Sequence, residues 1–130
     1  LYINYKRKLP MDVYTIYSDH TEECTAHEFV RYMNKFMDKL VEGGRMEAYR
    51  ITRMKLGFRS MELPEFRIDM EFKNMQQLDD AMSSVVTNEN KIEDEHHGFN
   101  KYVELETIQH FLYRDFPDDL TKHRESLNDK

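Results

Sequence analysis

The amino-acid sequence predicts an α+β fold whose elements follow the order β-α-β-β-α-β. Three observations lead to this prediction. Residues 11–18 and 65–72 alternate apolar and polar side chains, as half-buried strands do. Residues 29–41 and 75–86 instead carry apolar side chains at helical spacing. The third observation is a further segment rich in β-branched and aromatic residues after each of these helices, which supplies the remaining strands.

The first strand is expected at residues 11–18 (MDVYTIYS), and a polar connection separates it from the first helix. Thr25 and Glu28 have the spacing of a capping box at the start of this helix. Gly43 and Gly44 predict its end, because glycine readily adopts the left-handed conformation found there. The apolar stripe between these signals consists of Phe29, Val30, Met33, Phe36, Met37, Leu40 and Val41.

The second strand is predicted at residues 46–56, a loop at 57–64, and the third strand at 65–72. Asn74 can cap the second helix, with Gln77 three residues later. The stripe of this helix is formed by Met75, Leu78, Ala81, Met82, Val85 and Val86.

The last strand is predicted at residues 102–116, after a polar stretch at 87–101. Residues 1–10 are expected to be an N-terminal extension, and residues 117–130 a polar C-terminal tail. The folded domain is therefore expected to span residues 11–116.

Composition excludes several kinds of partner and site. The chain has 130 residues, which predicts one domain, and a net charge of −6, which disfavours nucleic acids and anionic membranes as partners. The single cysteine, Cys24, cannot form an internal disulfide, which favours a reducing, cytoplasmic location. The chain lacks a phosphate loop and a dinucleotide fingerprint, so no cofactor is expected.

The two faces of the predicted sheet differ in character. The helices are expected to cover Phe66, Ile68, Met70 and Phe72. The other face is expected to combine apolar side chains with the polar residues Arg50, Arg67, Asp69, Glu104, Glu106 and His110. A face of this mixed kind indicates a second protein layer with a polar cavity between the layers. The simplest second layer is another copy of the chain, so a homodimer is predicted.

The element order and the segments MDVYTIY, RITRMKLGF, EHHGFN and LYRDFPDD resemble the dimeric α/β-barrel superfamily of ferredoxin-like domains. Within it, they resemble a family of uncharacterised bacterial proteins. The resemblance extends over about residues 11–120, and it implies that the sheets of two copies close into one barrel. The superfamily includes cofactor-free monooxygenases, haem-degrading enzymes and amino-acid-binding regulatory modules, so the resemblance implies a fold and not a reaction. Haem-degrading members characteristically use a tryptophan, and this chain has none.

The segment EDEHHGFN, residues 93–100, has the composition of a metal or catalytic site. In a helix, Glu93 would lie on the same face as His96 or His97, and either pair could supply two ligands to one metal. Two ligands do not complete a tetrahedral site, so we expect a helix end and turn beside the cavity and no metal. A general-base role for one of the histidines stays open.

Two functions remain compatible with these residues. One is binding of a small anionic or carbonyl-bearing molecule in the barrel cavity by Arg50, Arg67, Asp69 and Tyr14. The other is a cofactor-independent monooxygenase or isomerase in which His110, His97 or His96 acts as general base. The sequence does not decide whether the protein is an enzyme.

Overall fold

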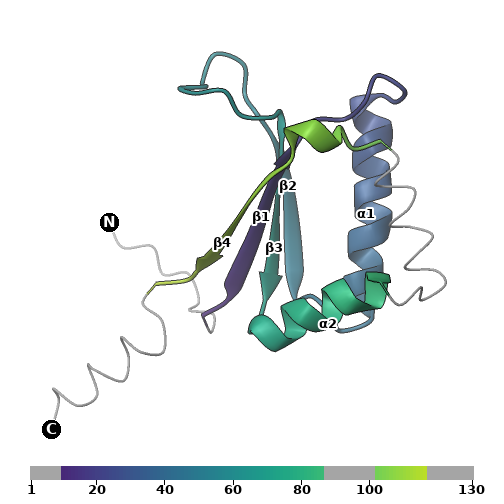
Figure 1. Cartoon of the computed structure of the whole chain (residues 1–130), viewed down its shortest axis with the longest axis vertical. Helices are drawn as coiled ribbons and strands as arrows, with labels where there is room; N and C mark the ends of the chain where they lie inside the picture. Colours follow the sequence, from purple (N-terminus) through teal and green to yellow (C-terminus); the bar gives the residue numbers. More distant parts are fainter. Residues whose placement is uncertain (1–9, 87–101, 117–130) are drawn as a thin grey trace, which may run out of the picture.

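The computed structural model describes residues 10–86 and 102–116, which form an antiparallel sheet with both helices on one side (Figure 1). The strand order across the sheet is β2-β3-β1-β4, so β2 and β4 are the edge strands. The predicted fold class and element order are confirmed. The elements are β1 (Asp12–Ser18), α1 (Ala26–Glu42), β2 (Ala48–Arg53), β3 (Phe66–Phe72), α2 (Met75–Val86), a short 3-10 helix (Leu105–Thr107) and β4 (Gln109–Arg114).

Helix α1 begins and ends as its sequence predicts. The Glu28 amide donates to the Thr25 hydroxyl (3.1 Å), and the Thr25 amide donates to the Glu28 carboxylate (2.9 Å). The backbone and side-chain hydrogen bonds with Thr25 lower the pKa of Glu28. At the other end Gly44 has a φ of 74°, and the Arg45 amide donates to the Leu40 carbonyl (2.9 Å). This pattern closes the last turn of the helix and turns the chain toward β2.

The hydrophobic core lies between the two helices and the sheet. Every second residue of β3 contributes to it, and the predicted inward face of this strand is confirmed. The buried core consists of Cys24, Phe29, Met33, Phe36, Met37, Leu40, Met46, Phe66, Ile68, Met70, Phe72, Ala81 and Val103. Tyr49 joins the edge strand β2 to α1, because its hydroxyl lies 2.9 Å from Asn34 and 2.7 Å from Asp38.

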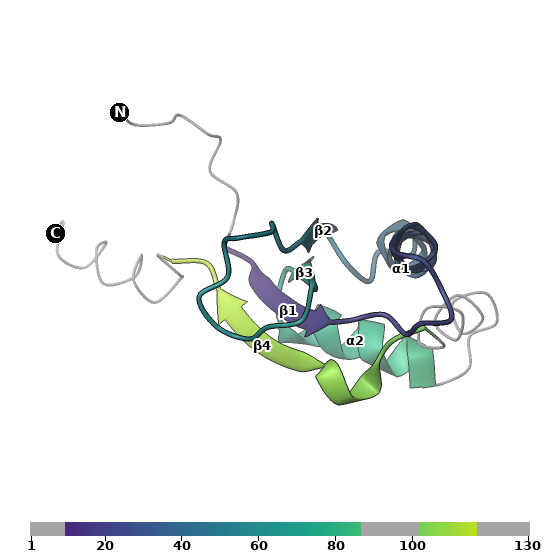
Figure 2. The same ribbon diagram turned by 90° about the horizontal axis from the view of Figure 1, so that it is seen from above.

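Helix α2 starts at the predicted cap. The Gln77 amide donates to the Asn74 side chain (2.9 Å), and the Gln77 side chain accepts from the Lys73 amide (2.7 Å). The side-chain NH2 group of Gln77 also donates to the Glu47 carboxylate (2.8 Å), which ties the helix to the connection before β2. Figure 2 shows α1 and α2 on the same side of the strands.

The predicted extents of two strands are wrong. The second predicted strand, 46–56, is shorter at both ends in the structure. The last one, 102–116, is interrupted by the 3-10 helix. This helix forms because the Thr107 hydroxyl accepts from the Asp19 amide (3.0 Å) and donates to the Glu104 carbonyl (2.6 Å). Regular pairing of β4 with β1 begins only after this turn.

The predicted face of His110 is also wrong. His110 pairs with Ile16 of β1, and Ile16 pairs with the buried Ile68 of β3. Paired residues in neighbouring strands point to the same side of a sheet, so His110 points to the side that carries the helices. Alternation then places Phe111 and Tyr113 on the opposite side, which is the reverse of the predicted arrangement.

Candidate functional site

The side of the sheet opposite the helices, here called the open face, carries the candidate site. The predicted placement of Arg50, Arg67 and Asp69 on this face is confirmed by the strand register. The open face consists of Ala48, Arg50, Thr52, Arg67, Asp69, Glu71, Val13, Thr15, Tyr17, Gln109, Phe111 and Tyr113.

A hydrogen-bonded network lies at the centre of the open face. The Thr15 hydroxyl, which is buried, donates to the Asp69 carboxylate (2.6 Å). The Arg67 Nε donates to the same carboxylate oxygen (3.1 Å). Burial lowers the pKa of Arg67. The hydrogen bond to Asp69 and the negative charge of Asp69 raise this pKa by more, so the pKa of Arg67 is raised overall. Asp69 therefore fixes a cation on the surface of the sheet.

Aromatic side chains flank this network on the side of β4. The Tyr17 and Phe111 rings meet edge to face with centroids 6.2 Å apart, and Phe111 lies 6.3 Å from Tyr113. The Arg67 guanidinium lies 5.9 Å from the centre of the Tyr17 ring. Phe111 is 43 % exposed and Tyr113 56 % exposed, so the open face presents a large apolar area to its surroundings.

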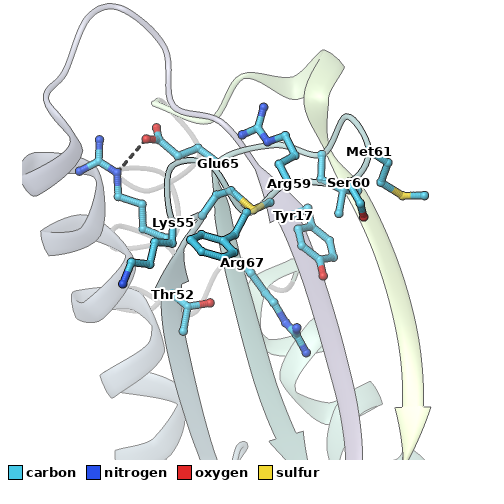
Figure 3. A pocket seen from close by; sticks show the side chains of 12 residues that line it. Tyr17, Thr52, Lys55, Arg59, Ser60, Met61, Glu65 and Arg67 are labelled. Atoms are coloured by element: carbon cyan, nitrogen blue, oxygen red, sulfur yellow. Dashed lines mark hydrogen bonds and ion pairs between the residues drawn. The ribbon is translucent and has the colours of Figure 1, made fainter.

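A cavity of about 330 Å³ lies where the open face meets the connection between β2 and β3. Tyr17, Thr52 and Arg67 line it from the strands, as Figure 3 shows. The connection closes the other side with Arg59, Ser60, Met61 and their neighbours. The volume of the cavity falls at the small end of the range of ordinary ligand pockets, which is about 300–1,000 Å³.

Cationic side chains outnumber acidic ones in the lining of this cavity. Arg53, Lys55, Arg59 and Arg67 line it, whereas Glu65 is its one acidic lining residue. Arg53 donates to Glu65 (2.7 Å), and Arg59 lies 3.6 Å from Glu62. Within the described residues, no ion pair is formed by Lys55. The cavity is thus positively charged in a protein whose net charge is −6.

No pattern in the sequence predicted this cavity. Residues 57–64 were predicted to form a loop, and only the fold places that loop beside Tyr17 and Arg67. A signal was present in the segment 53–59 (RMKLGFR), which combines cations with large apolar side chains. Such a combination in a loop is unusual unless the loop contacts another molecule.

The remaining predicted residues lie elsewhere. Arg50, which is exposed, lines a separate groove of about 560 Å³ between α1 and β2. Tyr14 and His110 lie together on the helix-facing side, with the Tyr14 hydroxyl 3.1 Å from His110 Nδ1 and the rings edge to face. Burial raises the pKa of Tyr14. His96, His97 and the rest of residues 93–100 lie outside the described residues, so their roles stay predictions.

Two negative findings apply to residues 10–86 and 102–116. No group of three or more His, Cys, Asp or Glu side chains in these ranges could hold a metal ion. Neither helix in the same ranges combines the length and apolarity required to cross a membrane.

Residues 11–128 match a protein family that is described as a family of unknown function (DUF6614). No curated protein matches the chain. The chain shares its fold with several solved structures, including the three described next. A protein from Arabidopsis thaliana is 6% identical, with a TM-score of 0.60 over 78% of this chain and 92% of that one. A dimeric ferredoxin-like protein of unknown function from Jannaschia sp. CCS1 is 10% identical, with a TM-score of 0.59 over 79% and 97%. A dimeric protein of unknown function and ferredoxin-like fold from Bacteroides fragilis is 13% identical, with a TM-score of 0.53 over 81% and 96%.

Proposed function

This chain belongs to DUF6614, a family of unknown function, and we propose that it is a homodimeric protein that binds a small anionic or carbonyl-bearing molecule on its open face. The cation-lined cavity beside Arg67 carries the proposal. A guanidinium held by a carboxylate keeps its terminal nitrogens in a fixed position, and it can bind a ligand carboxylate through two parallel hydrogen bonds.

Dimerisation is proposed from the same face. Phe111 and Tyr113 are large, exposed and adjacent to Tyr17, and aromatic residues are typical of the centre of protein interfaces. The Jannaschia and Bacteroides neighbours, which share the fold, are both described as dimeric. A second copy on the open face would shield the cavity from solvent and strengthen the attraction between the bound anion and its cations.

Binding of an anion can be tested with two carboxylates, benzoate and cyclohexanecarboxylate, each compared with its neutral amide by isothermal titration calorimetry. Each acid is expected to bind at least about tenfold more tightly than its amide, because a charge-assisted hydrogen bond contributes roughly 1.5–3 kcal/mol. Arg67→Ala should weaken the binding of both acids.

Arg31→Ala is the matched control, since Arg31 is an exposed cation on α1 and lines neither cavity. It removes the same charge from the protein and should leave binding unchanged. Equal affinities for acids and amides, or equal losses in the two variants, would contradict anion binding at this face.

A second candidate function rests on the contact between Tyr14 and His110. A histidine hydrogen-bonded to a tyrosine can accept a proton from a carbon acid, as an isomerase or a cofactor-independent monooxygenase requires. His110 is exposed on the edge strand β4, and Tyr14 lies on the neighbouring strand β1.

Exchange of the methyl hydrogens of pyruvate in deuterium oxide, followed by proton NMR, tests this second candidate. The protein should accelerate exchange, and His110→Gln should remove about 10²–10⁴-fold of the acceleration, the usual contribution of a general base. His27→Gln, which changes an exposed histidine of α1, serves as the control. Exchange at the same rate in all three proteins would exclude a catalytic role for His110 in this reaction.

A further inference from the structure

We propose that the cavity beside Arg67 selects an aromatic monocarboxylate, an inference that rests on the anion-binding function proposed above. Two properties of the cavity support it. Its lining combines aromatic rings and thioethers with cations, and its ion pairs leave a single positive charge without a partner.

The apolar part of the lining comes from both sides of the cavity. Tyr17 belongs to β1, whereas Phe58, Met54 and Met61 belong to the connection between β2 and β3. Phe58 is 77 % exposed and forms no ring contact within the described part of the chain. An aromatic side chain that lines a cavity without an aromatic neighbour can pack against the ring of a ligand.

The charges indicate how many carboxylates the ligand carries. The three carboxylates Glu62, Glu65 and Asp69 pair with three of the four cations that line the cavity. The remaining cation, Lys55, has no ion pair within the described residues. A monoanion would balance this charge, whereas a dianion or phosphate would introduce an excess negative charge beside the three carboxylates.

The position of Arg67 indicates where the carboxylate of such a ligand would bind. The guanidinium already lies 5.9 Å from the Tyr17 ring centre, and its Nε is occupied by Asp69. Its terminal nitrogens form no hydrogen bond within the described ranges. A flat ring that packs against Phe58 in this cavity could therefore direct an attached carboxylate toward the terminal nitrogens of Arg67, which lines the same cavity. An aliphatic ring of the same size lacks the flat face for this contact.

Calorimetric titration of the full chain with benzoate, cyclohexanecarboxylate and terephthalate tests the inference. Benzoate should bind about three- to tenfold more tightly than cyclohexanecarboxylate, which has the same charge and a similar size. Terephthalate, which carries a second carboxylate on the same ring, should bind no more tightly than benzoate. Phe58→Ala should reduce benzoate affinity to that of cyclohexanecarboxylate.

Leu56→Ala provides the matched control, because Leu56 lies in the same connection, is 96 % exposed and does not line the cavity. It should leave benzoate affinity unchanged. Equal binding of benzoate and cyclohexanecarboxylate, with both weakened by Arg67→Ala, would overturn the aromatic preference and leave anion binding in place. Tighter binding of terephthalate would overturn the monoanion assignment. Failure of all three carboxylates to bind would overturn both proposals.

Discussion

Phe111→Glu is expected to convert the protein from a dimer into a monomer. Phe111 lies on the open face between Tyr17 and Tyr113, where the second copy is proposed to pack. The substitution places a carboxylate in an apolar contact, and the two-fold symmetry of a homodimer places it there twice. Loss of an aromatic hot-spot residue costs about 2 kcal/mol or more, so the dissociation constant should rise at least about 30-fold.

Light scattering coupled to size-exclusion chromatography at micromolar concentration measures this change. Leu112→Glu is a suitable control, because Leu112 is the next residue of β4, is 49 % exposed and points to the opposite side of the sheet. The control should remain dimeric. A monomeric unmodified protein, or a dimer that survives Phe111→Glu, would contradict dimerisation through the open face.

Phe72→Ala is expected to lower the free energy of unfolding by about 3–5 kcal/mol, because it removes a ring from the interior and leaves a cavity. Phe72 is 0 % exposed and lies at the end of β3, on the side covered by the helices. A loss of this size is a large part of the roughly 5–15 kcal/mol that stabilises an ordinary domain. The variant should therefore unfold at much lower urea concentration.

Phe116→Ala makes the same chemical change at an exposed position, since Phe116 is 84 % exposed. It should change the free energy of unfolding by no more than about 0.5 kcal/mol. Both variants must be compared at one protein concentration, because dimerisation stabilises the folded state by mass action. Similar losses in the two variants would show that Phe72 is not a core residue.

The sequence by itself determined those elements whose signals are local. Thr25 with Glu28 and Gly43 with Gly44 predicted both ends of α1, because capping depends on residues three or four positions apart. Strict alternation in β3 placed Arg67 and Asp69 on one face and the buried residues on the other. The Arg67–Asp69 pair of the candidate site followed directly from this alternation.

Only the tertiary structure decided which residues join Arg67 at the cavity and which face His110 occupies. Thr107 bonds to Asp19, which is distant in sequence, and the resulting 3-10 turn sets where pairing of β4 begins. A shift of one residue in that start reverses the face of every side chain in the strand. The cavity likewise depends on a loop that carries no periodic pattern, and its contact with Tyr17 and Arg67 arises only when the strands on either side of the loop pair.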